Sequence, residues 1–103
     1  MTLLVDRPST VGFGKRYLEL WLNLRPGMPT VSAETGVHIC LRARTEEAVK
    51  SFHAAALANG GSDDGAPGPR QAPMTVYYVA FVRDPDGNRI EPASFPVKST
   101  TGA

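Results

Sequence analysis

Glu91 is the residue of this chain whose surroundings most suggest chemistry. It follows the segment Asp84–Gly87 (DPDG), in which an aspartate suits the first position of a turn, the proline presets φ and the glycine accepts positive φ. The turn separates two predicted strands, Val76–Arg83 and Arg89–Phe95, so Glu91 enters the second strand among apolar or neutral neighbours. A carboxylate placed in this way serves a metal or substrate site. An ordinary hairpin with a solvated glutamate fits the same pattern.

Another predicted strand, Val37–Arg42, carries an imidazole and a thiol on one face. Because strand side chains alternate, its three apolar residues share one face, and His38, Cys40 and Arg42 share the other. If the apolar face packs on the core, these three groups face away from it. Cys40 is then a soft ligand, a redox-sensitive thiol or small apolar filler.

Strict alternation predicts a further strand, Tyr17–Arg25, in which four leucines alternate with aromatic and polar residues. The leucine face must be buried, and we expect a helix to cover it. The other face carries Glu19, Trp21 and Asn23, a mixture that suits the wall of a cleft better than plain solvent.

Caps and turns predict the elements that position these residues. A helix is expected over Glu46–Asn59, because Thr45 is a good N-cap, two glutamates complement the helix dipole and a glycine pair stops the helix. Shorter strands are expected at Thr2–Arg7 and Thr10–Gly14.

Three segments lack such signals. Residues 26–36 are interpreted as a linker, and residues 96–103 as a flexible tail. Residues 61–73 are rich in glycine, proline and aspartate, which predicts a loop that holds at most a short edge strand and acts as a mobile lid.

Composition narrows the class of protein. The 103 residues make one domain, and 42% hydrophobic with 20% charged residues is typical of a globular chain. A net charge of +1 without a basic stripe gives no reason to expect nucleic acid, and no apolar run approaches the length of a membrane span. The single cysteine suits a reducing compartment, so a cytoplasmic domain is expected.

The order strand, helix, short strand, strand, strand over residues 37–95, with the ending DPDGNRIE at Asp84–Glu91, resembles a known family. It is similar to the second half of a glyoxalase / bleomycin resistance / extradiol dioxygenase (vicinal oxygen chelate) domain. The resemblance implies an α+β fold in which βαβββ modules form a curved mixed sheet. A single domain over residues 1–95 would hold a remnant of module one (1–25) and a complete module two (37–95).

The resemblance also implies a metal site. In that family the first and last strands of each module hold a divalent ion, and His38 and Glu91 match these positions in module two. Glu19 falls near the last-strand position of module one. The fourth position has no counterpart, because the first strand and helix of module one are missing. A truncation, a mis-assigned start or a partner subunit would account for this.

One imidazole and two carboxylates suit Zn, Mn, Fe or Ni, with water in the open positions. Strand parity agrees, because His38, Glu91 and Glu19 each fall opposite the apolar face of their own strand. Such an incomplete set of ligands binds an ion weakly, and the alternative prediction is that no metal is bound. His38 is then a strand histidine bonded to a neighbour, and Glu19 an unliganded cleft carboxylate.

Three functions are compatible with these residues. The first is a metal-dependent lyase, isomerase or dioxygenase-type enzyme, in which the ion stabilises an oxyanion and Glu91 and Glu19 are the catalytic carboxylates. The second is a non-catalytic, antibiotic-sequestering module that binds a small molecule. The third is an inactive family member that persists as a dimer. In each case the predicted cup is lined by Trp21, Asn23, Cys40 and Tyr78.

A homodimer is expected for a separate reason. Without the first strand and helix, the four leucines of Tyr17–Arg25 have no covering helix within the chain. An apolar face of that size favours association. A second copy would cover it, with exchange of modules between the chains.

Overall fold

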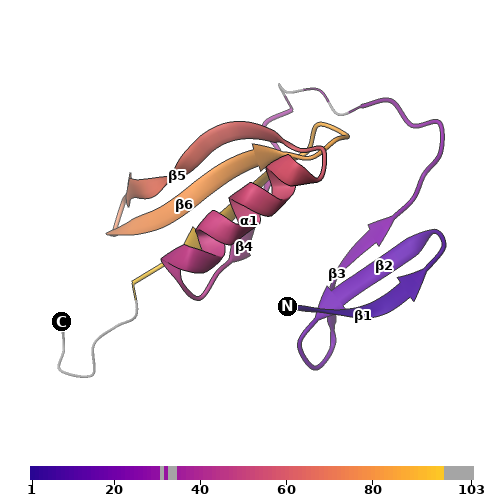
Figure 1. The fold of residues 1–103 in the computed structure, drawn as a ribbon, viewed down its shortest axis with the longest axis horizontal. Coiled ribbons are helices and arrows are strands. Elements are labelled where there is room, and N and C mark those ends of the chain that lie inside the picture. The colour runs from indigo at the N-terminus through magenta and orange to yellow at the C-terminus, as the bar shows by residue number, and fades with distance from the viewer. Residues whose placement is uncertain (31, 33–34, 97–103) are drawn as a thin grey trace.

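The computed structural model of the chain describes residues 1–30, 32 and 35–96, and in this part the strands form two sheets (Figure 1). The first sheet is antiparallel and contains β1 (Thr2–Arg7), β2 (Thr10–Gly14) and β3 (Leu18–Asn23). The second has the order β4-β7-β6-β5, and the helix α1 (Glu46–Ala58) packs on it. Its strands are β4 (His38–Arg42), β5 (Ser62–Ala72), β6 (Thr75–Arg83) and β7 (Arg89–Ser94).

The second sheet is mixed, as the resemblance implies. β4 pairs with β7 in parallel, whereas β5, β6 and β7 pair as an antiparallel meander. The chain therefore crosses from β4 through α1 before it returns to β7. The predicted α+β class and the βαβββ order of this part are confirmed.

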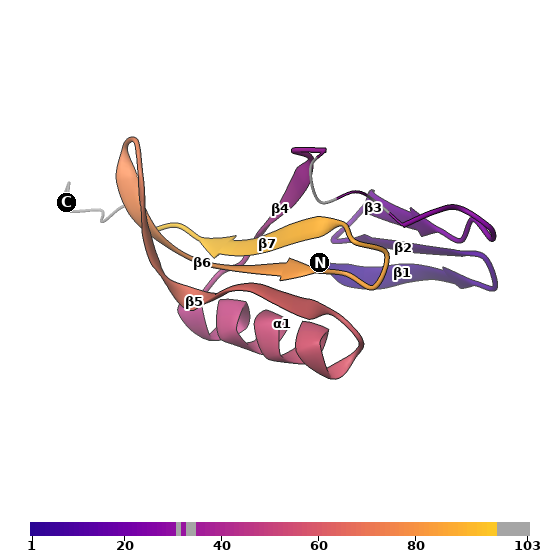
Figure 2. The same ribbon diagram turned by 90° about the horizontal axis from the view of Figure 1, so that it is seen from above.

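The core lies between α1 and one face of the second sheet (Figure 2). Val49 of α1 is fully buried, and so are Ala80 and Val82 on the helix side of β6, all at 1% exposure or less. Val79 and Ala93 are equally buried but belong to the other side of the sheet by register. Lys50 of α1 lies over the ring of Tyr78, which identifies the even-numbered side chains of β6 as the helix side.

We call the opposite side of this sheet the open face. The register places on it the odd-numbered side chains of β6 and β7 and the even-numbered side chains of β4, because paired residues of neighbouring strands point the same way. They include His38, Cys40, Arg42, Tyr77, Val79, Phe81, Arg83, Arg89, Glu91 and Ala93, and Phe95 just beyond β7 continues the same side.

The predicted helix is confirmed to within one residue. The Ala48 N–H donates to Thr45 Oγ1 at 3.1 Å, so Thr45 is the N-cap. The helix ends at Ala58, and Asn59, predicted as its last residue, is the C-cap. Gly60 follows with φ 96°, a conformation that glycine adopts without a steric penalty. None of the helices in the described residues is long and apolar enough to cross a membrane.

The prediction for residues 61–73 was wrong. They form an 11-residue strand, β5, in register with β6 from Ser62 opposite Arg83 to Ala72 opposite Thr75. Composition misled here because β5 is the edge of its sheet, where a proline without an N–H removes no bond to a further strand. Two register shifts absorb the irregular stretch around Gly65.

The three strands of the first sheet lie where the sequence predicts them, but no helix covers the leucine face in the described part of the chain. Leu22 is 52% exposed and Leu24 61% exposed, and the strands on which α1 packs are β5, β6 and β7 of the second sheet. The total accessible area is 7627 Å². A compact monomer of this mass exposes roughly 5,600 Å². The accessible surface of the molecule is therefore larger than that of a compact monomer of the same mass.

The described residues of the predicted linker, 26–30, 32, 35 and 36, contain no strand or helix. The predicted flexible tail, 96–103, lies outside the described residues except for Pro96.

A polar contact ties the edge strand to the helix. His53 Nε2 of α1 lies 2.8 Å from Asp63 Oδ1 of β5, and the His53 side chain is only 12% exposed. The hydrogen bond from His53, and after it the Gly65 N–H, hold the pKa of Asp63 below its ordinary value of 3.8. The folded state therefore favours the ionised carboxylate.

This contact predicts acid sensitivity. A carboxyl whose pKa is lowered by folding stabilises the protein above its unfolded pKa, and this contribution is lost as pH falls through the lower native value. Asp63→Asn should therefore weaken stability near neutral pH and flatten its loss below about pH 4. Urea unfolding at several pH values measures this, with Asp86→Asn on the exposed turn as the matched control. An acid profile of Asp63→Asn that parallels the wild type would contradict the assignment.

Candidate functional site

His38 and Glu91 meet on the open face. Their strands β4 and β7 are parallel neighbours, in which Cys40 lies opposite Glu91 and His38 lies opposite Arg89. His38 Nε2 is 2.9 Å from Glu91 Oε1. The side chain of Glu91 is 9% exposed and that of His38 is 53% exposed, so a buried carboxylate is paired with an accessible imidazole.

The turn before β7 fixes the position of Glu91. The Asp84 N–H donates to the Asn88 carbonyl, and the Gly87 N–H donates to the Asp84 carbonyl, both at 2.9 Å. Asp84 Oδ1 also accepts from the Asp86 and Asn88 N–H groups at 3.0 and 2.8 Å. Gly87 has φ 95°, as its place in the turn requires. β7 therefore begins in one register, which turns Glu91 to the open face.

Cys40 lies on the open face beside Glu91. Partial burial of the thiol, and after it the negative charge of Glu91, raise the pKa of Cys40 above its ordinary 9.0, although Arg42 opposes the shift. The thiol is therefore neutral near neutral pH. It is a weak nucleophile there, and an ion would have to displace its proton before it became a ligand.

The other predicted ligand, Glu19, lies on β3 in the first sheet, where its Oε1 accepts the Lys15 N–H at 3.1 Å. Within the described residues no group of three His, Cys, Asp or Glu side chains could hold a metal ion. The structure thus brings His38 and Glu91 together but not Glu19. A single chain supplies two of the three predicted ligands at one place.

The predicted cup residues are divided between the two sheets. Trp21, 44% exposed, and Asn23, which accepts from the Thr10 hydroxyl, lie on β3, and Cys40 lies on the open face. Tyr78 faces α1, because its partner in β7 is Ser94, which has the opposite parity to Glu91.

Tyr77 is the tyrosine that shares the face of Glu91, whereas the sequence-based prediction placed Tyr78 in the cup. Its ring stacks on Phe95 with centroids 5.2 Å apart and planes 8° apart. The guanidinium of Arg42 lies over Phe95, 5.3 Å from the ring centroid. Because strand side chains alternate, Phe95 is expected on the same face as Glu91. Pairing of the two strands across the turn at Asp84–Gly87 then places Tyr77 on that face as well.

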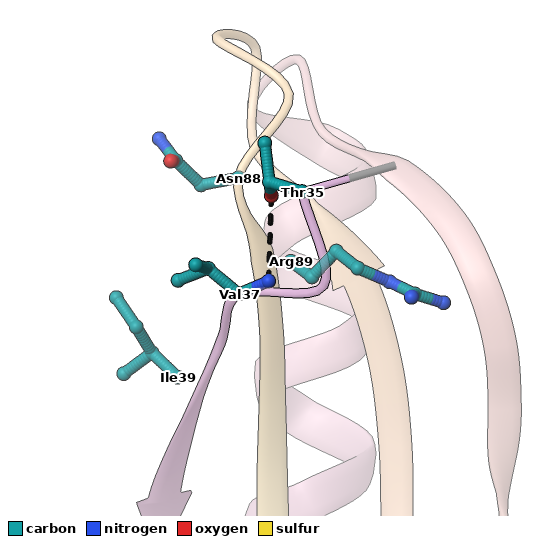
Figure 3. A pocket seen from close by; sticks show the side chains of 5 residues that line it. All are labelled: Thr35, Val37, Ile39, Asn88 and Arg89. Carbon is teal, nitrogen blue, oxygen red and sulfur yellow. Dashed lines mark hydrogen bonds between the residues drawn. The ribbon is translucent and has the colours of Figure 1, made fainter. Parts of the chain in front are cut away.

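Two shallow pockets of about 180 Å³ flank the second sheet. The first is lined by Thr35, Val37, Ile39, Asn88 and Arg89 (Figure 3). Val37 and Ile39 have the opposite parity to His38, so this pocket lies at the rim of β4 and does not contain the His38–Glu91 pair. The second pocket has Tyr77 and Phe95 in its wall, at the far end of β6 and β7.

The donor pair fits a divalent ion in part. Two donors bound at about 2.1 Å and roughly at right angles lie about 3 Å apart. The His38–Glu91 separation of 2.9 Å is thus compatible with two adjacent ligands of one ion. A third protein ligand would have to come from outside this face.

The sequence matches the family model of the Glyoxalase/Bleomycin resistance protein/Dioxygenase superfamily over residues 4–91. The chain belongs to this superfamily. A glyoxalase/bleomycin resistance protein from Albidiferax ferrireducens T118 is similar to it at 29% identity, with a TM-score of 0.75 over 88% of this chain and 74% of that one. The expected family is confirmed.

More distant structures share the fold of this superfamily member. A glyoxalase-related enzyme from Fulvimarina pelagi has 20% identity and a TM-score of 0.62, over 99% of this chain and 77% of that one. The hypothetical protein SA1046 from S. aureus has 18% identity and a TM-score of 0.65, over 91% of this chain and 75% of that one. No curated protein matches the chain significantly.

The environment of Cys40 predicts slow alkylation. At pH 8 iodoacetamide should modify Cys40 more slowly than free cysteine, because its raised pKa leaves little thiolate. Glu91→Gln removes the negative charge beside the thiol and should accelerate the reaction severalfold. Mass spectrometry of the alkylated fraction over time measures both rates, with Glu19→Gln as the control. Equal rates in wild type and Glu91→Gln would show that Glu91 does not act on the thiol.

Proposed function

We propose that this superfamily member is a metal-dependent enzyme that acts on a small oxygenated molecule bound at the open face. The observation that carries the proposal is the contact of 2.9 Å between His38 Nε2 and Glu91 Oε1 on neighbouring strands. Both groups are ligands that borderline divalent ions accept, so Zn, Mn, Fe or Ni would suit the pair.

The roles of the residues follow from their positions. His38 is accessible and would hold the ion from the solvent side, while Glu91 would hold it from the floor of the sheet. A bound divalent ion polarises a substrate oxygen and stabilises negative charge on it, which suits a lyase, isomerase or dioxygenase-type reaction. Glu19 would be a third ligand or a general base, brought to the site by a second copy of the chain.

The proposal includes a homodimer with exchanged modules, which would supply Glu19. The exposed leucine face of β3 and the large accessible area both favour association. Glu19 lies on the same strand as these leucines but on its other side, so a partner that covers the leucines leaves Glu19 accessible.

Metal analysis tests the catalytic proposal. After incubation with Zn, Mn, Fe or Ni and desalting, the wild type should retain about one ion per site, and His38→Ala should lose most of it. His53→Ala is the matched control, because the chain has two histidines and His53 is paired with Asp63 far along the helix side. Metal content that stays low in the wild type, or that is no lower in His38→Ala, would contradict the proposal.

Light scattering tests the dimer. At micromolar concentration the wild type should have twice its chain mass of 11.0 kDa. Leu22→Glu places a charge on the apolar face and should shift the protein towards the monomer. Leu57→Glu, on an exposed helix position, should not. A strictly monomeric wild type, or equal behaviour of the two variants, would contradict the proposed dimer.

One observation favours a second function, a metal-free module that binds a small molecule without chemistry. The His38–Glu91 pair is complete by itself, and no buried side-chain nitrogen or oxygen lacks a hydrogen-bond partner in the described residues. Glu91 therefore needs no metal to be stable in the fold. Thermal stabilisation by a ligand in the presence of EDTA, together with low metal content, would identify this function.

A further inference from the structure

Positive charge is concentrated on and around the open face. Four arginines contribute, of which Arg42, Arg83 and Arg89 belong to the face by register, and Arg70 of β5 reaches it over the ring of Phe81, 5.9 Å from the centroid. Two carboxylates, Asp64 and Glu91, oppose them. The face therefore carries a net positive charge larger than the +1 of the whole chain.

Three of the arginines have partners within the fold. Arg89 Nε donates to Asp64 Oδ2 at 3.2 Å, and Arg83 Nε lies 3.8 Å from Asp64 Oδ1. Arg83 also donates to the Gly87 carbonyl at 3.2 Å. Arg70 donates to backbone carbonyls of its own strand at 3.0 and 3.1 Å. These guanidinium groups hold β5 and the turn in place.

Arg42 differs from the other three. It is exposed at the end of β4, and among the described residues its guanidinium has no hydrogen bond or ion pair. Its contact is the ring of Phe95, which is itself stacked on Tyr77. The strand beneath is fixed, because the Ala43 N–H donates to the Ala93 carbonyl at 2.8 Å. A planar cation with free donors thus lies against a rigid aromatic pair.

We propose that Arg42 is an anion subsite of the open face and binds the oxyanion of a small organic ligand, a carboxylate or a phosphate. A guanidinium presents two parallel donors that match either group. The Tyr77–Phe95 pair beside it offers an apolar wall for the rest of the ligand. The inference names the substrate class of the proposed site and rests on the open face being that site.

The distance between Arg42 and the proposed metal ligands suits one small ligand that reaches both. Arg42 is two residues beyond Cys40, which lies opposite Glu91, so the subsite is about 7 Å along the strand from Glu91. By register Val79 and Ala93 lie between the two ends. Both are fully buried, and neither carries a polar side chain. A ligand of a few bonds' length would have its anion at Arg42 and an oxygen near His38 and Glu91.

Binding of simple probes in EDTA tests the subsite without any metal. Benzoate and phenyl phosphate are the anionic probes, and benzamide is the neutral isostere of benzoate. In NMR titrations the anions should move the Arg42 side-chain N–H and the Phe95 ring signals. Arg42→Gln should weaken this binding about tenfold or more. Arg42→Lys should retain part of it, and added salt should weaken it.

Arg44→Gln is the matched control, because Arg44 is exposed just beyond the end of β4. This variant should change the affinity for the anionic probes by no more than about twofold, because an exposed charge away from the subsite has only a small effect. Binding of benzoate alone assigns a carboxylate ligand, and binding of phenyl phosphate alone assigns a phosphate. The proposal is overturned if benzamide binds as well as benzoate, or if the Arg42 and Arg44 variants weaken binding equally. It is also overturned if neither anion moves the Arg42 and Phe95 signals.

Loss of metal binding and loss of the anion subsite are separate outcomes. His38→Ala should not change benzoate or phenyl phosphate binding in EDTA, because the probe contacts Arg42 and the aromatic pair. If the protein retains no metal but Arg42 binds the anion, the open face is a metal-free binding site. If metal binds but the anion does not, the substrate class is wrong and the metal proposal stands.

Discussion

The parallel pairing of β4 with β7 is the constraint on which the rest of this molecule depends. It sets Cys40 opposite Glu91 and leaves His38 one step away on the same face, within reach of the carboxylate. The helix α1 covers the other side of the sheet, where the apolar side chains of β6 gather. The open face is the side of this sheet that α1 leaves uncovered, and it carries the His38–Glu91 pair. Parallel neighbours need a long crossover connection, which α1, β5 and β6 supply between β4 and β7.

Because Glu91 is buried, its contact with His38 matters for the stability of the fold. An ionised carboxylate that is almost covered needs a cation or several donors, since an unpaired buried charge costs several kcal/mol. His38 supplies the partner in the chain alone, and a divalent ion would supply a stronger one to both groups. The same geometry thus supports a metal-free protein and a metal-bound one. Among the described residues the first sheet makes no substantial contact with α1 or the second sheet, so the proposed third ligand, Glu19, would have to come from a second copy.

Much of this arrangement could be predicted from the sequence, because strong local signals decide it. Thr45 and the glycine pair bound the helix, and the turn at Asp84–Gly87 fixes where β7 begins. Strand parity then places His38 and Glu91 on one face. The family follows from the same residues.

The rest depends on contacts that the sequence does not show. β5 forms because β6 offers it a partner, which its own composition does not reveal. Tyr77 and Tyr78 differ only in parity, and the parity is decided by the hairpin register. Glu19 was placed by alternation within its strand, yet alternation cannot show that its sheet lies apart from the other. Arg42 was recognised as a member of the polar face, but its lack of an ion-pair partner is a tertiary property.

The imidazole resonances of the two histidines provide the most direct test that His38 and Glu91 form one metal-binding unit. In a long-range proton–nitrogen NMR spectrum, titration with Zn²⁺ should move the ring nitrogens of His38 and leave those of His53 unchanged. Glu91→Gln should weaken the His38 response by about tenfold or more, since a carboxylate ligand is lost. If neither histidine responds, both respond alike, or the Glu91 variant responds as the wild type does, the account of a shared site is contradicted.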